Sequence, residues 1–421
     1  MKLASYEIAH DFNTAWLNFE LDLPLTPSSV GAPNAFYINR PDSTLNHLYN
    51  ELLSPFYAPP KLFIAGHGGT GKSTELLHIS SNINIQEKFW PVLFSIREET
   101  DSVDVDVQDL LLAIGSQLYR KYKNSGGKLP SKLLEEIDSW RGEVEVEILK
   151  KKGKVVESEI SAGVAALFAN AGLKMKIEPD TRKTIRQILK PRTQELITII
   201  NEISSAIYTR ENRMPLIIID DLDKLDLGIA KHIFGQCLDT LLSPNCAIIY
   251  LISQTLFYSN EIESIRAIRE RSYIISAIRL HKGKKMKKID ERGYQALESM
   301  VLMRISRKLI TDEALNRAII FSGGIPRELC RLVRTAIGRA RYKQRNSISV
   351  EDVEWAISLM INEYRRFLDR NDWAELAKIK TGEFYWSEKI APLLRLLAVM
   401  EYMDENGKVW HDVHPILSKL L

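Results

Sequence analysis

Runs of mainly apolar residues recur through the first two thirds of the chain, each long enough for one buried strand. The runs lie at residues 61–65, 90–96, 216–219, 247–252 and 273–280. Between them, apolar residues repeat every three or four positions, as in 45–53 and 109–122, which is typical of helices that bury one face. Buried strands that alternate with helices predict an α/β fold with a parallel sheet covered on both faces.

Residues 143–160 interrupt this pattern. A strictly alternating run at 143–148 leads into a lysine- and glycine-rich turn at 150–154, and a second mixed run follows at 155–160. Alternation with a period of two is typical of half-buried strands. We therefore expect a hairpin-type insert at about 141–177. The insert either contacts a partner or another copy of the chain, or it is a surface insertion without a binding role.

From about residue 290 the apolar pattern becomes continuously helical. Helices are predicted over residues 294–308, after Thr311 as N-cap, from Pro326 as the first helical residue, and after Ser349. These helices predict an all-α lid that follows the sheet-containing core.

The C-terminal segment has a different pattern. Leucines within 393–397 predict a buried helix, and Tyr402, Val409 and Trp410 flank a tight turn at 405–407. A helix beside a short ribbon predicts a small winged-helix-like domain. The expected order is an N-terminal segment at 1–60, an α/β core with its insert at 61–285, a helical lid at 286–370 and the C-terminal domain at 371–421.

Composition and charge narrow the class of protein. The chain has 421 residues, of which 45% are hydrophobic and 26% charged, so it can bury a sizeable core without disulfide bonds or structural metal ions. The net charge of +3 does not by itself indicate a nucleic-acid partner. Cys237, Cys246 and Cys330 lack C-x-x-C spacing, which argues against a zinc site or a disulfide framework. No apolar run reaches the roughly 20 residues that span a bilayer, so a soluble, cytoplasmic protein is expected.

The glycine-rich segment after the first apolar run carries the clearest chemical signal. Gly66-x-x-x-x-Gly71-Lys72-Ser73 matches the phosphate-loop pattern in full. Glycines allow the backbone to curl around a phosphate, and the following helix directs its positive N-terminus at the anion. Lys72 reaches the β- and γ-phosphates, and the Ser73 hydroxyl ligates Mg²⁺. We expect ATP and Mg²⁺ to be bound by Gly66, Gly68, Gly69, Thr70, Gly71, Lys72, Ser73 and Thr74.

Polar residues follow two of the later strands. Asp220 and Asp221 end the run at 216–219, where ligands bind in open α/β sheets. We assign Asp220 to the Mg²⁺ shell and Asp221 to orienting the attacking water. Asp223 is a candidate for the same site, with the cap of the next helix as the alternative. Ser253 follows the run at 247–252 and is a candidate to contact the γ-phosphate, with Gln254 and Thr255 as alternatives.

The chain resembles an AAA+/STAND ATPase of the replication-initiator-like branch. Residues 37–40 are similar to the segment that contacts adenine in that family, and 220–224 resemble the second nucleotide motif of STAND and KAP ATPases. Residues 322–329 are similar to the lid motif, which implies that Arg327 senses the γ-phosphate. The family often carries Glu where Asp221 stands, so hydrolysis is expected to be slow. The absence of an Asn-Lys-x-Asp motif favours ATP over GTP.

The resemblance also implies an arginine finger, an arginine that completes the site of a neighbouring subunit. Candidates are Arg266, Arg269 and Arg271, with a solvated basic helix as the alternative. It further implies a homo-oligomer, a separate effector protein, or both. Two basic clusters leave a nucleic-acid partner open. Their members are Lys282, Lys284, Lys285, Lys287 and Lys288, and then Arg327, Arg331, Arg334, Arg339, Arg341, Lys343 and Arg345.

Three functions follow from these expectations. The first is an ATP-hydrolysing switch that controls an effector protein, for instance in bacterial antiphage defence. The second is a DNA-associated loader or initiator-like ATPase. The third is a nucleotide-binding scaffold that hydrolyses little ATP.

Overall fold

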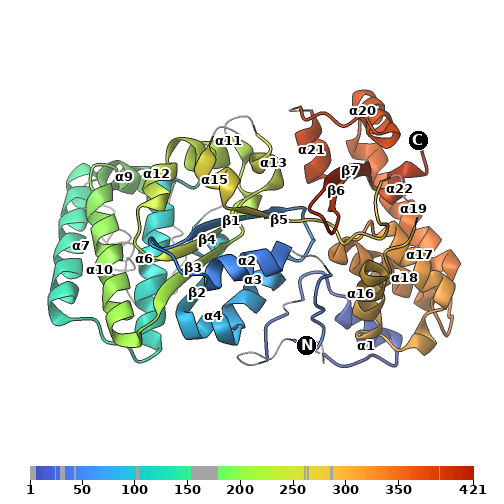
Figure 1. Cartoon of the computed structure of the whole chain (residues 1–421), viewed down its shortest axis with the longest axis horizontal. Coiled ribbons are helices and arrows are strands. Elements are labelled where there is room, and N and C mark those ends of the chain that lie inside the picture. Colours follow the sequence, from blue (N-terminus) through green and yellow to red (C-terminus); the bar gives the residue numbers. More distant parts are fainter. Residues whose placement is uncertain are drawn as a thin grey trace. The chain divides into compact units, whose positions relative to one another are not determined.

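A computed structural model describes residues 6–23, 25–28, 34–41, 44–100, 104–152, 179–259, 262, 265–284, 288–387 and 389–421. The chain divides into two compact units (Figure 1). The first, here called the sheet unit, comprises Asn50–Ile64 and Asn82–Tyr273. The second, here called the loop-and-lid unit, comprises Met1–Tyr49, Ala65–Ser81 and Ile274–Leu421.

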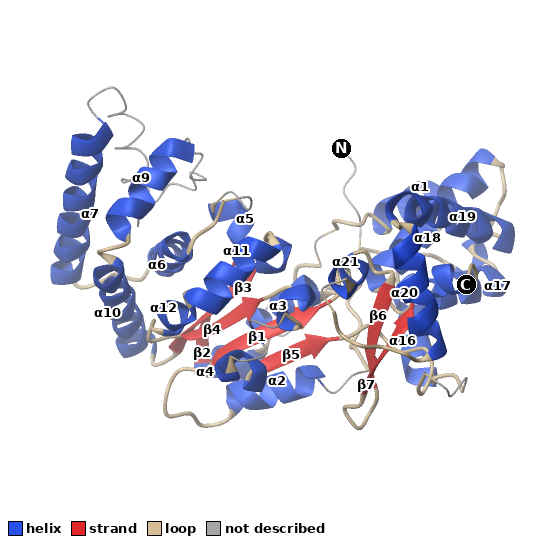
Figure 2. Ribbon diagram, turned by 90° about the horizontal axis from the view of Figure 1, so that it is seen from above, coloured by secondary structure: helices blue, strands red, loops and turns tan. Residues whose placement is uncertain are grey.

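Five strands form one sheet in the order β2-β3-β4-β1-β5. The β2–β3, β3–β4 and β4–β1 pairs are parallel, and helices flank both faces (Figure 2). The side chains of β1 and β4 are buried throughout, as expected for strands covered on both sides. This confirms the predicted α/β core. The strands are β1 (Lys61–Gly66), β2 (Phe89–Ser95), β3 (Met214–Asp220), β4 (Ala247–Leu251) and β5 (Ser272–Ile275).

The fifth strand is shorter than the predicted run at 273–280. Beyond Ile275 the backbone stays extended but leaves the ladder. Ala277 donates its N–H to the carbonyl of Glu401, and Ile278 donates to that of Gly324. The apolar residues of this run therefore pack inside the loop-and-lid unit instead of lengthening the sheet.

Helices of the sheet unit occupy the segments between strands. They are α4 (Ile83–Lys88), α5 (Ile96–Glu99), α6 (Val107–Asn124), α7 (Ser131–Lys152), α9 (Pro179–Leu189), α10 (Thr193–Glu211), η2 (Leu222–Lys224), α11 (Leu227–Lys231), η3 (His232–Gln236), α12 (Leu238–Leu242), α13 (Gln254–Phe257) and α15 (Arg266–Glu270). Helix α2 (Thr44–Leu53) begins in the loop-and-lid unit and ends in the sheet unit.

The predicted hairpin is wrong over its first strand, because residues 143–148 lie inside α7. The buried residues of this helix are spaced by three or four positions, whereas Val146, which the alternation would place beside Val144, is 48% exposed. A helical period over the longer segment therefore outweighs the short alternation. The buried positions are Leu133, Ile137, Trp140, Val144 and Ile148. Residues 153–178, the rest of the predicted insert, lie outside the described residues.

The loop-and-lid unit is mostly helical. Thr311 accepts the Ala314 N–H as N-cap and Pro326 takes the first helical position, both as predicted. The helix predicted after Ser349 is also present, and Ser349 forms a capping box with Asp352. The helix predicted over 294–308 instead runs between residues 291 and 302, because Asp290 caps it earlier. The helices are α1 (Phe12–Asn18), α3 (Lys72–Ser81), α16 (Glu291–Leu302), η4 (Arg307–Leu309), α17 (Asp312–Phe321), α18 (Pro326–Tyr342), α19 (Val350–Phe367), α20 (Arg370–Thr381), α21 (Ile390–Arg395) and α22 (Pro415–Ser418).

The predicted C-terminal ribbon is present. Strands β6 (Val399–Met403) and β7 (Val409–Val413) pair antiparallel, with Tyr402 opposite Trp410. Gly407 closes the turn between them at φ 78°, a conformation that favours glycine. Helices flank this ribbon, which fits the winged-helix-like expectation. In the part of the chain that the structure describes, no helix combines the length and the apolar character needed to cross a bilayer.

Candidate functional site

The glycine-rich loop between β1 and α3 has the backbone that a phosphate cradle requires. Gly66, Gly69 and Gly71 have φ values of 147°, 80° and 97°. A Cβ on Gly66 would lie 2.4 Å from the carbonyl oxygen of Ile275, so only glycine fits there. Beside Gly68 and Gly71 a Cβ would meet no atom within 4 Å. The loop thus has free space on the side where an anion would bind.

Lys72 begins α3 and folds back over this loop. Its Nζ donates hydrogen bonds to the carbonyl oxygens of Gly66 at 2.9 Å and His67 at 2.8 Å. The Thr70 hydroxyl also donates to the His67 carbonyl, at 2.9 Å. Lys72 is buried, whereas Ser73, the predicted Mg²⁺ ligand, is exposed on the first turn of α3. The lysine charge is therefore held at the loop.

The N-terminal segment predicted to contact the nucleotide packs against this loop and its helix. Arg40 donates to the carbonyl oxygens of Thr70 at 2.6 Å and Ser276 at 2.5 Å. The Tyr37 hydroxyl donates to Glu75 at 3.1 Å, and its ring stacks on His78 with centroids 4.4 Å apart. Burial, with the nearby Glu75 charge, raises the pKa of Tyr37. Tyr37 therefore stays a neutral donor.

Arg327, the predicted sensor, contacts the loop through its backbone. Its N–H donates to the Gly69 carbonyl oxygen at 3.2 Å. Its side chain turns elsewhere, to an ion pair of 2.7 Å with Asp22, a residue that is 87% exposed. The start of α18 is thus attached to the loop, and the guanidinium is held by the surface ion pair with Asp22 and by a hydrogen bond of 3.4 Å to the Leu21 carbonyl oxygen.

His67, a variable position of the motif, links the loop to the C-terminal ribbon. Its Nε2 accepts a hydrogen bond from the Glu401 N–H at 2.8 Å, so Nδ1 carries the proton and faces the Leu394 carbonyl oxygen at 3.3 Å. Burial lowers the pKa of His67 to about 4, which keeps the ring neutral. On β6, Glu401 pairs with His411 of β7 at 3.3 Å. Sequence reasoning missed this histidine because its partners lie more than 300 positions away.

In the sheet unit, three acids gather where β3 ends. Carboxylate oxygens of Asp220, Asp221 and Asp223 lie within 4.8 Å of one another, a spacing that suits a cation. Asp221 has φ 66° and accepts short hydrogen bonds from Ser95 and Lys224. Burial alone would raise the pKa of Asp221, but these two hydrogen bonds lower it below its usual value. The carboxylate is therefore kept ionised.

Sequence reasoning did not include Ser95 in the site. The only signal was its place as the last polar residue of the second apolar run. The β2–β3 register sets Ser95 directly opposite Asp220, which brings its hydroxyl within reach of Asp221.

The remaining predicted site residues also lie in the sheet unit. Ser253 is the N-cap of α13 and accepts a hydrogen bond from the Leu256 N–H at 3.1 Å, so its hydroxyl proton can still be donated. The finger candidate Arg266 opens α15, but its side chain lies outside the described part. Arg269 and Arg271 are exposed at the end of that helix. Their finger role stays a prediction.

Comparison with protein families agrees with this geometry. Residues 42–251 match the KAP family P-loop domain. The chain carries a P-loop NTPase domain. It is therefore a nucleotide-binding protein, in which the glycine loop and the acids after β3 are the motifs expected of the domain. No curated protein matches the chain significantly.

Solved structures with similar folds include ORC and Cdc6 proteins. Drosophila ORC bound to DNA is 11% identical with a TM-score of 0.42, covering 100% of this chain and 95% of that one. Cdc6p from Pyrobaculum aerophilum is 12% identical with a TM-score of 0.41, covering 91% and 95%. The Aeropyrum pernix ORC2 protein in ADPNP-ADP complexes is 12% identical with a TM-score of 0.38, covering 90% and 93%. At these scores the likeness adds no argument about function.

Several members of the predicted basic clusters have partners where the structure describes them. Lys284 donates to the backbone carbonyls of Ile379 and His411, and residues 285–287 lie outside the described part. On α18 and just after it, arginines form ion pairs with acids of the same unit. These pairs join Arg331 to Glu363, Arg334 to Glu20, Arg339 to Asp352, and Arg345 to Glu351 and Asp352. These four arginines therefore already face acids, whereas Lys282 and Lys288 of the first cluster are exposed.

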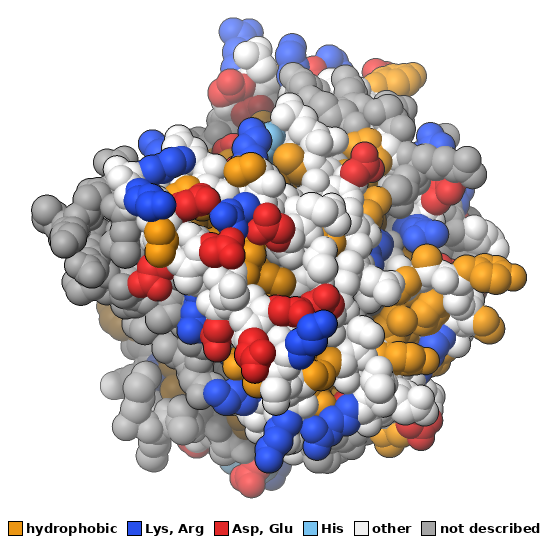
Figure 3. Space-filling model, turned by 90° about the vertical axis from the view of Figure 1, so that its left-hand side faces the viewer, with side chains coloured by type: hydrophobic (Ala, Val, Ile, Leu, Met, Phe, Trp, Pro, Cys, Tyr) orange, Lys and Arg blue, Asp and Glu red, His pale blue; other side chains and the backbone are white. Residues whose placement is uncertain are grey.

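The surface of the sheet unit carries side chains of both charges on the face that lies to the left in Figure 1, where α7 and α10 are. Figure 3 shows acidic and basic side chains interspersed there, with hydrophobic side chains between them. Such a surface is typical of a solvated protein face and does not by itself indicate a nucleic-acid interface.

Proposed function

We propose that this chain is an ATP-binding and slowly ATP-hydrolysing molecular switch that controls a partner effector protein. The observation that carries the proposal is the pair of hydrogen bonds from the phosphate loop to two other elements. Gly69 accepts from the backbone of Arg327 on α18, and His67 accepts from Glu401 on the ribbon. A change of nucleotide at the loop would thus act directly on the lid helices and on the C-terminal element.

The chemistry assigns a role to each group. The loop backbone and Lys72 bind the phosphates, and Ser73 with Asp220 hold Mg²⁺, which offsets charge on the phosphates. Asp221 orients the attacking water, and Ser253 contacts the γ-phosphate. Because Ser95 and Lys224 already engage Asp221, that carboxylate is a weak base, which supports slow turnover.

Arg327 senses the γ-phosphate in this scheme. Its side chain would leave the exposed Asp22 and turn toward the nucleotide when ATP binds. A surface ion pair of this kind is worth only about 0–1 kcal/mol, so it opposes the movement weakly. Arg269, Arg271 or Arg266 would complete a neighbouring copy's site in a homo-oligomer.

The deciding experiment measures ATP binding, ATP turnover and mass for the wild type, Lys72→Ala and Asp221→Asn. Lys72→Ala is expected to lose binding, and Asp221→Asn to bind ATP with turnover reduced by about 100-fold or more. Lys132→Ala, an exposed lysine of α7, serves as the matched control and should behave as wild type. If the wild-type protein bound no nucleotide, the proposal would be wrong.

The same assay separates the other two functions. The ion pairs along α18 favour an effector protein over DNA as the partner. A DNA-associated ATPase would instead show turnover that DNA stimulates strongly, lost in the double variant Lys282→Glu/Lys288→Glu of two exposed lysines. A scaffold would bind ATP without turnover, and Asp221→Asn would change nothing. Bacterial antiphage defence is one setting for the switch, and a phage-challenge assay of Lys72→Ala tests it.

A further inference from the structure

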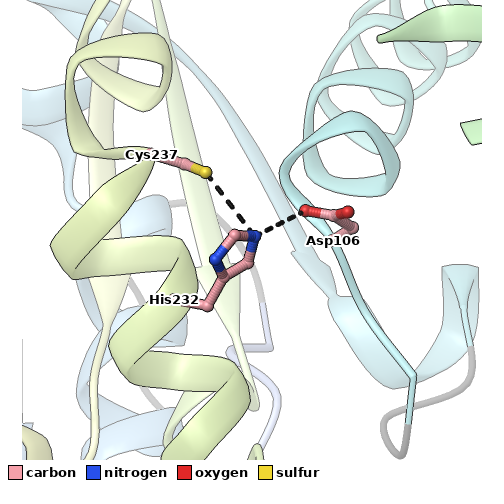
Figure 4. A group of neighbouring side chains, drawn as sticks. All are labelled: Asp106, His232 and Cys237. Carbon is pink, nitrogen blue, oxygen red and sulfur yellow. Dashed lines mark hydrogen bonds and ion pairs between the residues drawn. The ribbon is translucent and has the colours of Figure 1, made fainter. Parts of the chain in front are cut away.

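Three side chains that commonly ligate metals converge in the sheet unit, outside the nucleotide motifs. Nε2 of His232 lies 3.4 Å from Oδ1 of Asp106 and 3.7 Å from Sγ of Cys237 (Figure 4). All three ligand atoms lie within 4.8 Å of one another. Asp106 and Cys237 are half-buried, and 46% of the His232 side chain is exposed, so an ion could enter from solvent.

Local backbone structure produces this arrangement. His232 starts the π-helical turn η3, in which the Cys237 N–H donates to the His232 carbonyl oxygen at 3.2 Å. That turn places Cys237, residue i+5, above His232, residue i, and single π turns recur at functional sites. Asp106 is the N-cap of α6 and is fixed by accepting the Val107 N–H at 2.7 Å. Both sides of the group are therefore held by backbone hydrogen bonds.

The spacing suits a tetrahedral zinc ion. Ligand nitrogen and oxygen at about 2.0–2.1 Å from zinc, and sulfur at about 2.3 Å, lie about 3.3–3.4 Å (N to O) and about 3.6 Å (N to S) apart at the tetrahedral angle. The observed separations of 3.4 Å and 3.7 Å match both values. A zinc ion would need only small movements of these side chains.

The orientation of the imidazole separates a metal site from a catalytic triad. In a nucleophilic triad the thiol and the carboxylate use different ring nitrogens of the histidine. Here both face Nε2, while Nδ1 lies 2.7 Å from Oε1 of Gln236. With Oε1 as the acceptor, Nδ1 carries a proton, and Nε2 faces both the thiol and the carboxylate. An outer carbonyl that orients a ligating histidine is typical of metal sites.

We propose that Asp106, His232 and Cys237 bind one zinc ion, with water in the fourth position. Cys237 binds as the thiolate and releases its proton to solvent when zinc enters. The ion would join the start of α6 to the turn after α11. The lack of C-x-x-C spacing does not argue against this site, because a single cysteine suffices when the fold brings the other two ligands to it.

The test uses the full-length, reduced, metal-free protein in excess Mg²⁺, titrated with Co²⁺. Wild type should bind one equivalent with a thiolate-to-cobalt charge-transfer band that Zn²⁺ removes. Cys237→Ser should lose the charge-transfer band, and His232→Ala should no longer bind the one equivalent of Co²⁺. Gln236→Ala, which leaves the ligands intact, should weaken binding about 10- to 100-fold. Asp106→Asn keeps a good N-cap, so its loss of affinity would report the missing ligand and not an unfolded α6.

Matched controls make the outcome decisive. Cys330→Ser and His47→Ala should bind cobalt as wild type does, and so should Lys72→Ala, which separates this site from the nucleotide site. Circular dichroism confirms that each variant is folded. A wild type without the charge-transfer band, or a band that survives Cys237→Ser, overturns the proposal. If Cys237→Ser does not fold, an unchanged affinity in Gln236→Ala overturns it equally.

Discussion

The phosphate loop and the acidic segment at 220–223 are held in opposite ways. The loop depends on partners far along the chain, from Arg40 to Arg327 and Glu401, within the loop-and-lid unit. The acidic segment depends on Lys224, three positions away, and on Ser95 of the neighbouring strand. Perturbing the loop should therefore disturb a whole unit, whereas perturbing the acids should have local effects.

Acidification should produce the largest difference between the two regions. The pKa of His67 is about 4 in the folded chain, below the unfolded value near 6.5, so the unfolded state binds the proton first. Stability should fall as the pH drops from about 6.5 to 4, by on the order of 3 kcal/mol from this residue. His414, buried with a pKa of about 3, adds to the loss. Urea denaturation across this range measures the slope.

The acids should respond only at lower pH. The lowered pKa of Asp221 stabilises the folded state at pH values above the usual carboxyl pKa, near 4, and that stability is lost as the pH falls below this value.

His67→Asn should reduce the slope of stability against pH between pH 6.5 and 4, while His47→Asn, at an exposed position, should not. Equal slopes in wild type and His67→Asn would contradict the buried-histidine account.

A methyl group at Gly69 should have the next largest effect. Gly69 has φ 80°, and a Cβ there would lie 2.7 Å from Cβ of Arg327. Gly69→Ala should cost about 2–4 kcal/mol and weaken ATP binding, because strain and overpacking combine. Gly68→Ala is the matched control in the same loop, because a Cβ there would meet no atom within 4 Å, and it should change stability by less than about 1 kcal/mol. Similar losses in both variants would mean that the loop does not press against α18.

Removing Lys224 should have a smaller and local effect. Lys224→Ala should cost about 1 kcal/mol or less, since the lysine is 47% exposed. The affinity for ATP should stay within a few-fold of wild type, as measured by calorimetry. Lys231→Ala, a basic residue of the nearby α11, is the control. A large loss of ATP affinity in Lys224→Ala alone would show that the acidic segment is not locally determined.

The smallest change in stability is expected from Arg327→Ala. Its ion pair with Asp22 is exposed, so the variant should lose about 0–1 kcal/mol in thermal denaturation. Turnover should nevertheless fall if Arg327 senses the γ-phosphate, and Asp22→Ala should leave turnover intact. Unchanged turnover in Arg327→Ala would remove the sensor role while leaving its backbone contact with Gly69.

Errors in the sequence-based interpretation arose where a short pattern was ambiguous. In 143–148, Val144 and Ile148 fit a strand with a period of two and also one face of a helix, and only the longer run that includes Trp140 separates the two readings. The basic residues of α18 left a nucleic-acid partner open. Their acidic partners, such as Glu20 and Glu363, come from other segments and could not be assigned from spacing.

The strands of the sheet, the phosphate loop and the helix starts at Thr311 and Ser349 could be predicted from the amino-acid sequence alone. These features depend on apolar periodicity, on backbone freedom at glycine and on hydrogen bonds over three or four residues, all of which are local. By contrast, tertiary packing brings His67 to the ribbon and Asp106 to His232 and Cys237. Such contacts join residues far apart in the chain, and packing of whole elements, rather than any local preference, brings them together.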